Sequence, residues 1–343
     1  MGIVPVTDRP APVRSAATYD LRIVHAKELR PMSFLVIGEC VADIVRAPAG
    51  SGAADRVHAG GSPANVAYGL GRLGRDVTLL TQLADDTTGR LIGAHLKGAG
   101  VRVEVGEVPE RTPSAVVGLD ARGQASYTFD IAWTLKGGAP AGLAPRHVHI
   151  GSIAAVTAPG AAAVLAETER LRERATVSYD PNVRPALMGE HGSAVTRVER
   201  CVALSDLVKA SDEDLAWLYP GEEPKTVAAR WLALGPAVVL VTRGAAGSLA
   251  FTERETVAAE APPVTVVDTV GAGDSFMSAV LDALAGWERD ALGTLGAEDL
   301  ARILGRAGTA AAVTVSRAGA QPPDRAELDA ARETFALRSV RAW

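Results

Sequence analysis

Short strand-like runs alternate with longer helix-like segments along most of the chain, and this alternation restricts the fold more than any other feature. From about residue 33 onward, runs rich in Val, Ile and Leu are followed by Ala- and Leu-rich segments of helical period. Such a pattern is typical of parallel strands joined by helices. Because the strand runs are apolar throughout, both faces of their sheet are expected to be covered. The sequence therefore predicts an α/β fold with a mostly parallel sheet.

Seven segments are expected as core strands: 34–37, 77–83, 147–150, 176–179, 207–209, 237–242 and 264–267. Seven others are expected as helices: 62–73, 88–99, 158–174, 212–218, 226–234, 275–287 and 300–315. Two further stretches, about 43–59 and 101–131, alternate apolar and polar residues with period two and lack a helical segment. We expect these two stretches to form a small antiparallel sheet that covers a cleft.

Composition excludes several classes of protein. The chain has 343 residues, 48% of them hydrophobic and 22% charged, which excludes a disordered chain and suffices for a core without disulfides. No apolar run approaches the roughly 18 residues that would span a bilayer. A net charge of −5, with scattered Arg residues, argues against nucleic-acid binding. Cys40 and Cys201 form no CxxC pair. We therefore expect a cytoplasmic protein that binds neither nucleic acid nor membranes.

The two ends of the chain differ from the segments beside them. Residues 1–31 are polar and proline-rich, and they lack the basic stretch and apolar core of a secretory signal. We expect a flexible N-terminal extension over 1–31, a folded domain over 32–335 and a tail over 336–343. Met32 is then a candidate for the start of the functional chain.

A glycine-rich turn before a helix is the most informative local pattern. Residues 264–276 lead from a strand-like run through small residues into a helix-like segment. The backbone N–H groups of residues 271–274 can therefore converge at the positive end of that helix, an arrangement that binds anions. Asp274 stands at the helix start, where a carboxylate can accept the proton of an attacking hydroxyl. It can equally cap the helix, so this segment alone leaves both roles open.

A second glycine pattern, from Gly69 to Gly74, matches the G-x-G-x-x-G of dinucleotide sites. That motif requires its glycines to follow a strand and open a helix. Here Ser62 and Pro63 start the expected helix, and Gly74 lies where a glycine commonly ends one. An NAD-dependent oxidoreductase is therefore an alternative that rests on this match alone.

Several motifs together resemble the ribokinase-like (PfkB) carbohydrate kinase family, in the family's order and over about 32–328. The segment D-T-V-G-A-G-D at 268–274 resembles the C-terminal signature, and G-G-S-P-A-N-V-A at 60–67 resembles the N-terminal one. D-P-N-V-R at 180–184 resembles a segment of fructokinase-like and 2-keto-3-deoxygluconate kinase-like members. The resemblance implies a ribokinase-like three-layer sandwich with a small β-sheet lid over the substrate.

The resemblance also implies ATP-dependent phosphorylation of a sugar hydroxymethyl group. It makes Asp274 the general base and the amides of Gly271, Ala272 and Gly273 part of the anion hole. The residues implied to contact the sugar are Asp43, Gly60, Gly61, Asn65 and Asp274. Those implied to contact the nucleotide are Thr242, Gly244, Gly247, Gly271, Gly273, Gly319 and Ala320.

Some of these residues have a plainer interpretation when taken singly. Asp43 is then a turn residue at a strand end, and Asn65 is a solvated helix position. Asn182 and Arg184 are candidates to clamp a phosphate or an acidic substrate, although most Arg residues pair at the surface.

One motif departs from the family. Its N-x-x-E element, which helps to place Mg²⁺ through water, is replaced here by Ser-Asp-Glu-Asp at 211–214. Asp214 becomes the candidate for this role, and Asp268 the candidate for holding a monovalent cation such as K⁺. The implied cofactors are ATP and Mg²⁺, with K⁺ as a further candidate.

The wording of residues 60–65 and 180–184 favours a fructokinase-like substrate. 2-Keto-3-deoxygluconate kinase and ribokinase activities are the alternatives within the class, and the partners are then a small sugar and ATP. A nucleotide-binding regulatory protein without turnover is an alternative from another class, and the intact Asp274 with its glycines argues against it. The lids of this family often form dimer contacts, so a homodimer through the lid is also expected.

Overall fold

The computed structural model describes residues 32–47, 54–119 and 125–340, all of which belong to the unit Met32–Trp343. The expected N-terminal extension over 1–31 lies outside the described residues. So do the segments 48–53 and 120–124 of the expected lid, and residues 341–343 of the expected tail.

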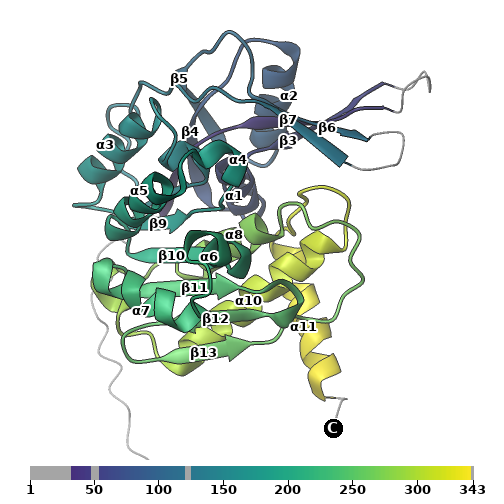
Figure 1. Ribbon diagram of the computed structural model, residues 1–343. Coiled ribbons are helices and arrows are strands. Elements are labelled where there is room, and N and C mark those ends of the chain that lie inside the picture. Colours follow the sequence, from purple (N-terminus) through teal and green to yellow (C-terminus); the bar gives the residue numbers. More distant parts are fainter. Residues whose placement is uncertain (1–31, 48–53, 120–124, 341–343) are drawn as a thin grey trace, which may run out of the picture. The chain divides into compact units, whose positions relative to one another are not determined.

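The main sheet has nine strands in the order β13-β12-β11-β10-β9-β8-β1-β4-β5 (Figure 1). Seven of them run parallel to one another: β1 (Ser33–Ile37), β4 (Asp76–Gln82), β5 (Arg102–Glu107), β8 (His147–Gly151), β9 (Thr176–Asp180), β10 (Leu207–Ser211) and β11 (Val238–Thr242). Two antiparallel strands, β12 (Ser248–Phe251) and β13 (Thr256–Ala259), extend one edge. The carboxyl ends of the parallel strands therefore meet at one rim of the sheet, the usual place for a ligand.

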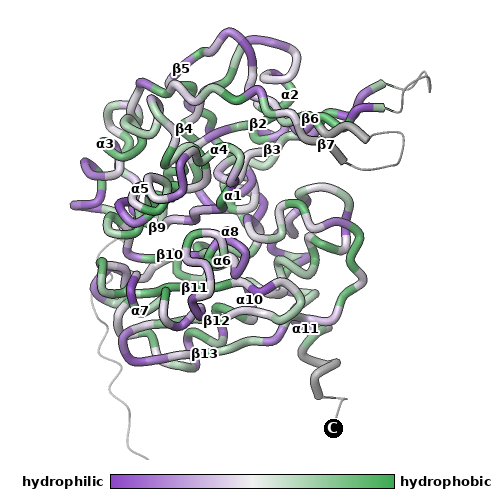
Figure 2. Tube along the Cα trace, in the orientation of Figure 1, coloured by the Kyte–Doolittle hydropathy of each residue, from purple (hydrophilic) through white to green (hydrophobic). Residues whose placement is uncertain are grey.

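Helices cover both faces of this sheet. Phe34 and Val36 pack into one core with α1 (Ser62–Arg72), α2 (Thr87–Gly98), α8 (Ala272–Ala283) and α10 (Ala297–Val315). Leu35 and Ile37 point the other way, into a core with α3 (Ala161–Leu171), α5 (His191–Ala203), α6 (Asp212–Leu218) and α7 (Pro224–Leu234). The middle strands also carry buried polar residues, such as His149, Ser178 and Lys209, so Figure 2 shows hydrophobic and hydrophilic residues mixed along the main sheet. The predicted three-layer α/β fold is confirmed.

A separate four-stranded sheet leaves the body at the end of β1. Its order is β3 (Arg56–Gly60), β2 (Val41–Val45), β6 (Ser114–Leu119) and β7 (Ala125–Asp130). β2 follows β1 after three residues, and β3 leads through Gly61 into α1. The small sheet is thus tied to the rim of the main sheet and to the start of α1 (Figure 1).

The expected strand at 264–267 is wrong. Val266 and Val267 are 59% and 61% exposed, and they lie in an extended loop rather than in a sheet. At the end of this loop the N–H groups of Val267 and Asp268 donate to the carbonyl of Val315. Apolar β-branched residues suggested a strand, but the run pairs with no strand of the described sheets, and β13 forms the edge instead.

Several other elements differ from expectation. Residues 102–107, assigned above to the small sheet, pair instead with β4 as β5, because their alternation reflects an edge strand with one covered face. The polar α5 was not expected, nor were α4 (Pro185–Met188) and α9 (Arg289–Leu292). The helix α11 (Arg325–Val340) runs through most of the expected tail. No helix in the described part of the chain is long and apolar enough to cross a membrane.

Candidate active site

Asp274 joins the two glycine motifs that the sequence singled out. It lies in the first turn of α8, and its side chain faces the first turn of α1. Ser62 Oγ donates to Asp274 Oδ1 at 2.7 Å, and Asn65 Nδ2 donates to Asp274 Oδ2 at 2.8 Å. Two segments more than 200 residues apart in the chain therefore fix both oxygens of one carboxylate.

Burial and polar neighbours have opposite effects on the pKa of Asp274. Burial raises the pKa of Asp274 above its usual range, since only 9% of the residue is exposed. The hydrogen bonds from Ser62 and Asn65 lower that pKa, as do the charges of Lys209 and Arg184. A carboxylate held at a raised pKa, with spare lone pairs, is suited to accept a proton from a neighbouring hydroxyl.

The loop before α8 has the shape of an anion site. Gly271 is left-handed, with φ 76° and ψ 2°, and a Cβ there would lie 2.5 Å from Ala320 Cβ. Only glycine fits both demands. The N–H of Ala272 donates to Thr269 O at 3.3 Å, whereas those of Gly273 and Asp274 belong to the helix start, where no carbonyl of the same helix can accept them. These amides are available to an anion in front of α8.

Each glycine of the N-terminal motif lies in close contact with another part of the chain, Gly60 with Asp43 and Gly61 with Glu39. A Cβ on Gly60 would be 2.1 Å from Asp43 Oδ2, and one on Gly61 would be 2.4 Å from Glu39 O. Gly61 also has φ 97°, so both glycines are required by close approach of the chain. Burial raises the pKa of Asp43 to about 6; the charge of Asp274 contributes to this rise, and the charges of His58 and Arg184 oppose it. The carboxylates of Asp43 and Asp274 therefore lie close enough to repel each other.

The D-P-N-V-R segment leaves β9 at the same rim. Asn182 has φ 36°, and its N–H donates to Asp180 Oδ1 at 3.2 Å. Arg184 is exposed, and its Nη1 donates to the carbonyls of Asn182 and Val183 at 3.3 and 3.0 Å. Its charge lowers the pKa of Asp274, so Arg184 stands near enough to act on the site.

Asp214 is engaged locally. Ser211 caps α6 in a capping box, in which Asp214 Oδ2 accepts the N–H of Ser211 at 2.8 Å and Asp214 N donates back to Ser211 Oγ. Asp214 Oδ1 accepts the N–H of Val183 at 2.7 Å. Each oxygen keeps a lone pair for a water, which fits a Mg²⁺ ion held chiefly by phosphates and water. Ser211 thus serves as the N-cap of α6, a position that asparagine would fill equally well.

The expected nucleotide residues come from two loops. Thr242 ends β11 beside Ser211 of β10, and Gly244 and Gly247 follow with φ 51° and 85°. A Cβ on Gly247 would lie 2.0 Å from Ala259 O, so β13 requires a glycine there.

The second loop carries Gly319 and Ala320. The N–H of Gly319 donates to Asp268 Oδ2 at 2.8 Å, and that of Val270 donates to Asp268 Oδ1 at 3.0 Å. Burial raises the pKa of Asp268, but these hydrogen bonds outweigh burial and hold that pKa below its usual range. Asp268 is thus an anchor between the two loops, and its remaining lone pairs fit a monovalent cation.

The dinucleotide interpretation of the glycines at 69–74 is wrong. Gly69 and Gly71 lie inside α1, and a Cβ on Gly69 would be 2.4 Å from Ser278 Oγ of α8. These glycines allow two helices to pack closely, and Gly74 follows the end of α1 with φ 74°.

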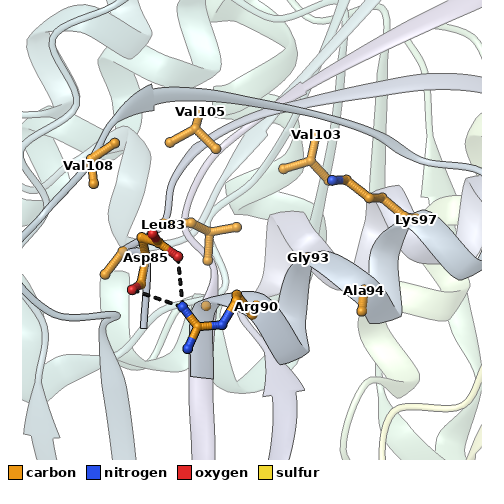
Figure 3. Close-up of a pocket in the computed structure, with 11 residues that line it drawn as sticks. Leu83, Asp85, Arg90, Gly93, Ala94, Lys97, Val103, Val105 and Val108 are labelled. Carbon is orange, nitrogen blue, oxygen red and sulfur yellow. Dashed lines mark hydrogen bonds and ion pairs between the residues drawn. The ribbon is translucent and has the colours of Figure 1, made fainter. Parts of the chain in front are cut away.

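A cavity of about 430 Å³ lies elsewhere, between α2 and β5 (Figure 3). Asp85 pairs there with Arg90 at 2.8 Å, and Val103, Val105 and Val108 line the opposite wall. None of its lining residues is one of those described above, so the converging polar groups at Asp274, rather than this cavity, mark the candidate site.

Sequence reasoning missed three polar residues of the site: Ser62, Glu39 and Lys209. Ser62 was visible only as a helix start. Burial raises the pKa of Glu39 to about 7, and its carboxylate accepts the N–H of Ala154 at 3.2 Å. A lone Lys inside the apolar strand run 207–211 was the available signal for Lys209, because buried lysines are rare unless paired.

Comparison with known proteins extends this picture. A model of the pfkB family carbohydrate kinases matches residues 32–327. The fructokinase of Rhizobium leguminosarum bv. trifolii is 34% identical over 233 residues, which are 66% of this chain and 72% of that protein. The fructokinase of Klebsiella pneumoniae is 33% identical over 259 residues, which are 73% of this chain and 83% of that protein.

Solved structures agree. A fructokinase from Xylella fastidiosa with bound ATP superimposes with a TM-score of 0.78 at 26% identity, covering 89% of this chain and 99% of that one. A fructokinase double mutant from Vibrio cholerae O395, bound to fructose, ADP and potassium ion, gives 0.74 at 26% identity, covering 88% and 98%. With the family model matched over nearly the whole described chain, the protein belongs to the pfkB family of carbohydrate kinases.

Proposed function

We propose that this protein transfers the γ-phosphoryl group of ATP to a hydroxymethyl group of fructose, with Asp274 as the general base. The observation that carries the proposal is the placement of a buried carboxylate, oriented by Ser62 and Asn65, beside the free amides at the start of α8. A base and an anion site side by side are what in-line phosphoryl transfer to a hydroxyl requires.

In this mechanism the sugar lies between the small sheet and the rim of the main sheet. Asp43 accepts hydrogen bonds from sugar hydroxyls, and Gly60 and Gly61 let the sugar approach the backbone. The reacting hydroxyl gives its proton to Asp274 as its oxygen bonds to the γ-phosphorus, and ADP leaves with the electrons of the broken bond. The amides of Gly271 to Asp274 face the negative charge of the transferred group.

The nucleotide is proposed to lie over the loops that carry Thr242, Gly244, Gly247, Gly319 and Ala320. Mg²⁺, when bound with ATP, neutralises phosphate charge, and Asp214 is the residue that would reach it through water. Asp268 is the candidate residue for a monovalent cation, a proposal supported by the potassium ion in the Vibrio cholerae fructokinase.

Fructose is proposed as the substrate because the relatives described above are fructokinases. The test is an ADP-release assay with Mg-ATP against fructose, ribose, 2-keto-3-deoxygluconate, glucose, tagatose and a nucleoside. We expect the highest kcat/KM with fructose. A higher kcat/KM with 2-keto-3-deoxygluconate would instead identify the substrate as an acidic sugar bound by Arg184. ATP binding without turnover of any sugar would favour a regulatory protein.

Dimerisation through the small sheet stays a prediction. Its outer strands β3 and β7 are candidates for contact with a second copy. Sedimentation velocity of the full chain tests it directly. The cytoplasmic location also stays a prediction.

A further inference from the structure

A buried ammonium group lies directly behind the candidate anion site. Lys209 is on β10, only 3% of it is exposed, and its Nζ donates to Asp180 Oδ2 at 2.9 Å. Asp180 ends the neighbouring strand β9 and is fully buried. Burying an ion pair of this kind is costly, so stability alone gives a weak reason for its presence in the middle of a sheet.

The position of the ammonium suggests its task. A Cβ on Gly273 would lie 3.0 Å from Lys209 Nζ, so the charge sits against the backbone whose amides form the anion site. A side chain at position 273 would push the ammonium away. The glycine is therefore required for contact with Lys209 as well as for the approach of a ligand.

Lys209 interacts electrostatically with several acidic residues. Burial lowers the pKa of Lys209, but Asp180, Asp214 and Asp274 outweigh this and raise it above its usual range. Lys209 in turn lowers the pKa of both Asp180 and Asp274. His149 of β8 is the other titratable group affected, since Lys209 helps to keep its imidazole neutral.

We propose that Lys209 is a positioning residue for phosphoryl transfer, which holds Asp274 ready as an anion and adds positive potential behind the amide of Gly273. The negative charge of Asp180 partly offsets the effect of the Lys209 charge on Asp274. The inference rests on the proposed role of Asp274 as base, and it adds a second source of positive charge to a site otherwise built from backbone amides.

The signs of the expected pH effects follow from the charges. Removal of the Lys209 charge leaves Asp274 with less stabilisation, so its pKa rises and the acid limb of the pH profile moves to higher pH. Removal of the Asp180 charge takes away a repulsion, so the limb moves to lower pH. Two other charged groups that act on Asp274 remain in both variants: Asp43 from the small sheet and Arg184 from the loop after β9. Asp214 also remains, but it acts on Lys209 and loses that partner in Lys209→Met.

The experiment measures kcat/KM for the sugar from pH 5 to 9 in Lys209→Met and Asp180→Asn. We expect shifts of about one pH unit in opposite directions, and a kcat in Lys209→Met about 10- to 100-fold lower. Asp180→Asn keeps an oxygen to accept the N–H of Asn182. Arg306→Met is the matched control, because Arg306 also forms a buried ion pair, with Asp282 at 2.8 Å on α8, and we expect no shift there.

A double variant covers the case in which Lys209→Met does not fold because Asp180 is left unpaired. In Lys209→Met/Asp180→Asn neither charge remains, and its acid limb is expected at higher pH than that of Asp180→Asn alone. Acid limbs that stay in place, or move the same way in both single variants, overturn the inference. Asp274→Asn distinguishes failure of this inference from failure of the proposed function. Near-normal turnover in Asp274→Asn would show that Asp274 is not the general base, whatever the effect of Lys209.

Discussion

Ser62 Oγ donates a hydrogen bond of 2.7 Å to Asp274 Oδ1 across 212 positions of the chain. This bond ties the first turn of α1 to the first turn of α8 and lies at the centre of the account. It orients the proposed base, and it also links the start of α1, which follows the small sheet in the chain, with the proposed anion site.

The bond itself can be tested with Ser62→Ala. Loss of the hydroxyl removes one of the two hydrogen bonds that lower the pKa of Asp274, so that pKa rises and the acid limb of kcat/KM moves to higher pH. The control is Ser278→Ala, which removes a buried hydroxyl on α8 that donates to the carbonyl of Ser275 rather than to Asp274. An acid limb that moves equally in both variants would contradict the role of Ser62.

Gly271 tests the shape of the anion site. Gly271→Ala places a side chain at φ 76°, at a cost of about 1 to 2 kcal/mol, and drives its Cβ into Ala320. We expect kcat to fall about 100-fold or more as the amides move. Gly286→Ala is the matched control, because Gly286 has φ 104° and open space around it. Thermal melts should show a loss in both variants, but only Gly271→Ala should lose turnover.

Gly60 tests the sugar end of the site. A Cβ there would meet Asp43 Oδ2 at 2.1 Å, so Gly60→Ala should displace that carboxylate without any backbone strain. We expect KM for the sugar to rise about tenfold or more, the effect of one lost charged hydrogen bond, with a smaller change in kcat. Gly93→Ala in α2 has open space and serves as the control. An unchanged KM in Gly60→Ala would remove Asp43 from the sugar site.

Glu39 tests how buried charge affects stability. Burial raises its pKa from 4.5 to about 7, so the folded chain keeps a proton that the unfolded chain loses, and stability falls as pH rises through this window. Glu39→Gln lacks this loss. We therefore expect the difference in unfolding free energy, variant minus wild type, to be about 2 to 3 kcal/mol larger at pH 8 than at pH 5.

Urea unfolding at the two pH values measures this difference. Glu253→Gln is the control, since Glu253 is exposed in the turn between β12 and β13. If the two variants show the same dependence on pH, the carboxyl of Glu39 ionises as freely in the folded state as in water.

Local sequence predicted much of the fold because the signals were local. Pro63 marked the start of α1, and the helix expected at 212–218 is α6, which the structure places at Asp212–Leu218. The runs at β1, β4 and β8 to β11 are almost entirely buried, and their apolar residues were enough to identify them as strands. The strands β12 and β13 were missed because an antiparallel edge has one partly exposed face and a weaker pattern.

The candidate site was predictable only in part. The glycine motifs could be recognised from the spacing of their residues. A close contact or a left-handed backbone explains each glycine at positions 60, 61, 247 and 271. The partners of Asp274 could not be found this way, because Ser62 and Lys209 reach it through the fold. The valines at 264–267 misled because their composition favoured a strand, although this run pairs with no strand of the described sheets.

The most direct measurement compares ADP release by the wild-type protein and by Asp274→Asn, with Mg-ATP in the presence and absence of fructose. The account predicts fructose-dependent release in the wild type and a kcat about 10² to 10⁴ lower in Asp274→Asn, with ATP still bound. Asp85→Asn, an exposed carboxylate paired with Arg90, should match the wild type. Near-normal turnover in Asp274→Asn, or release that does not depend on a sugar, would contradict the account.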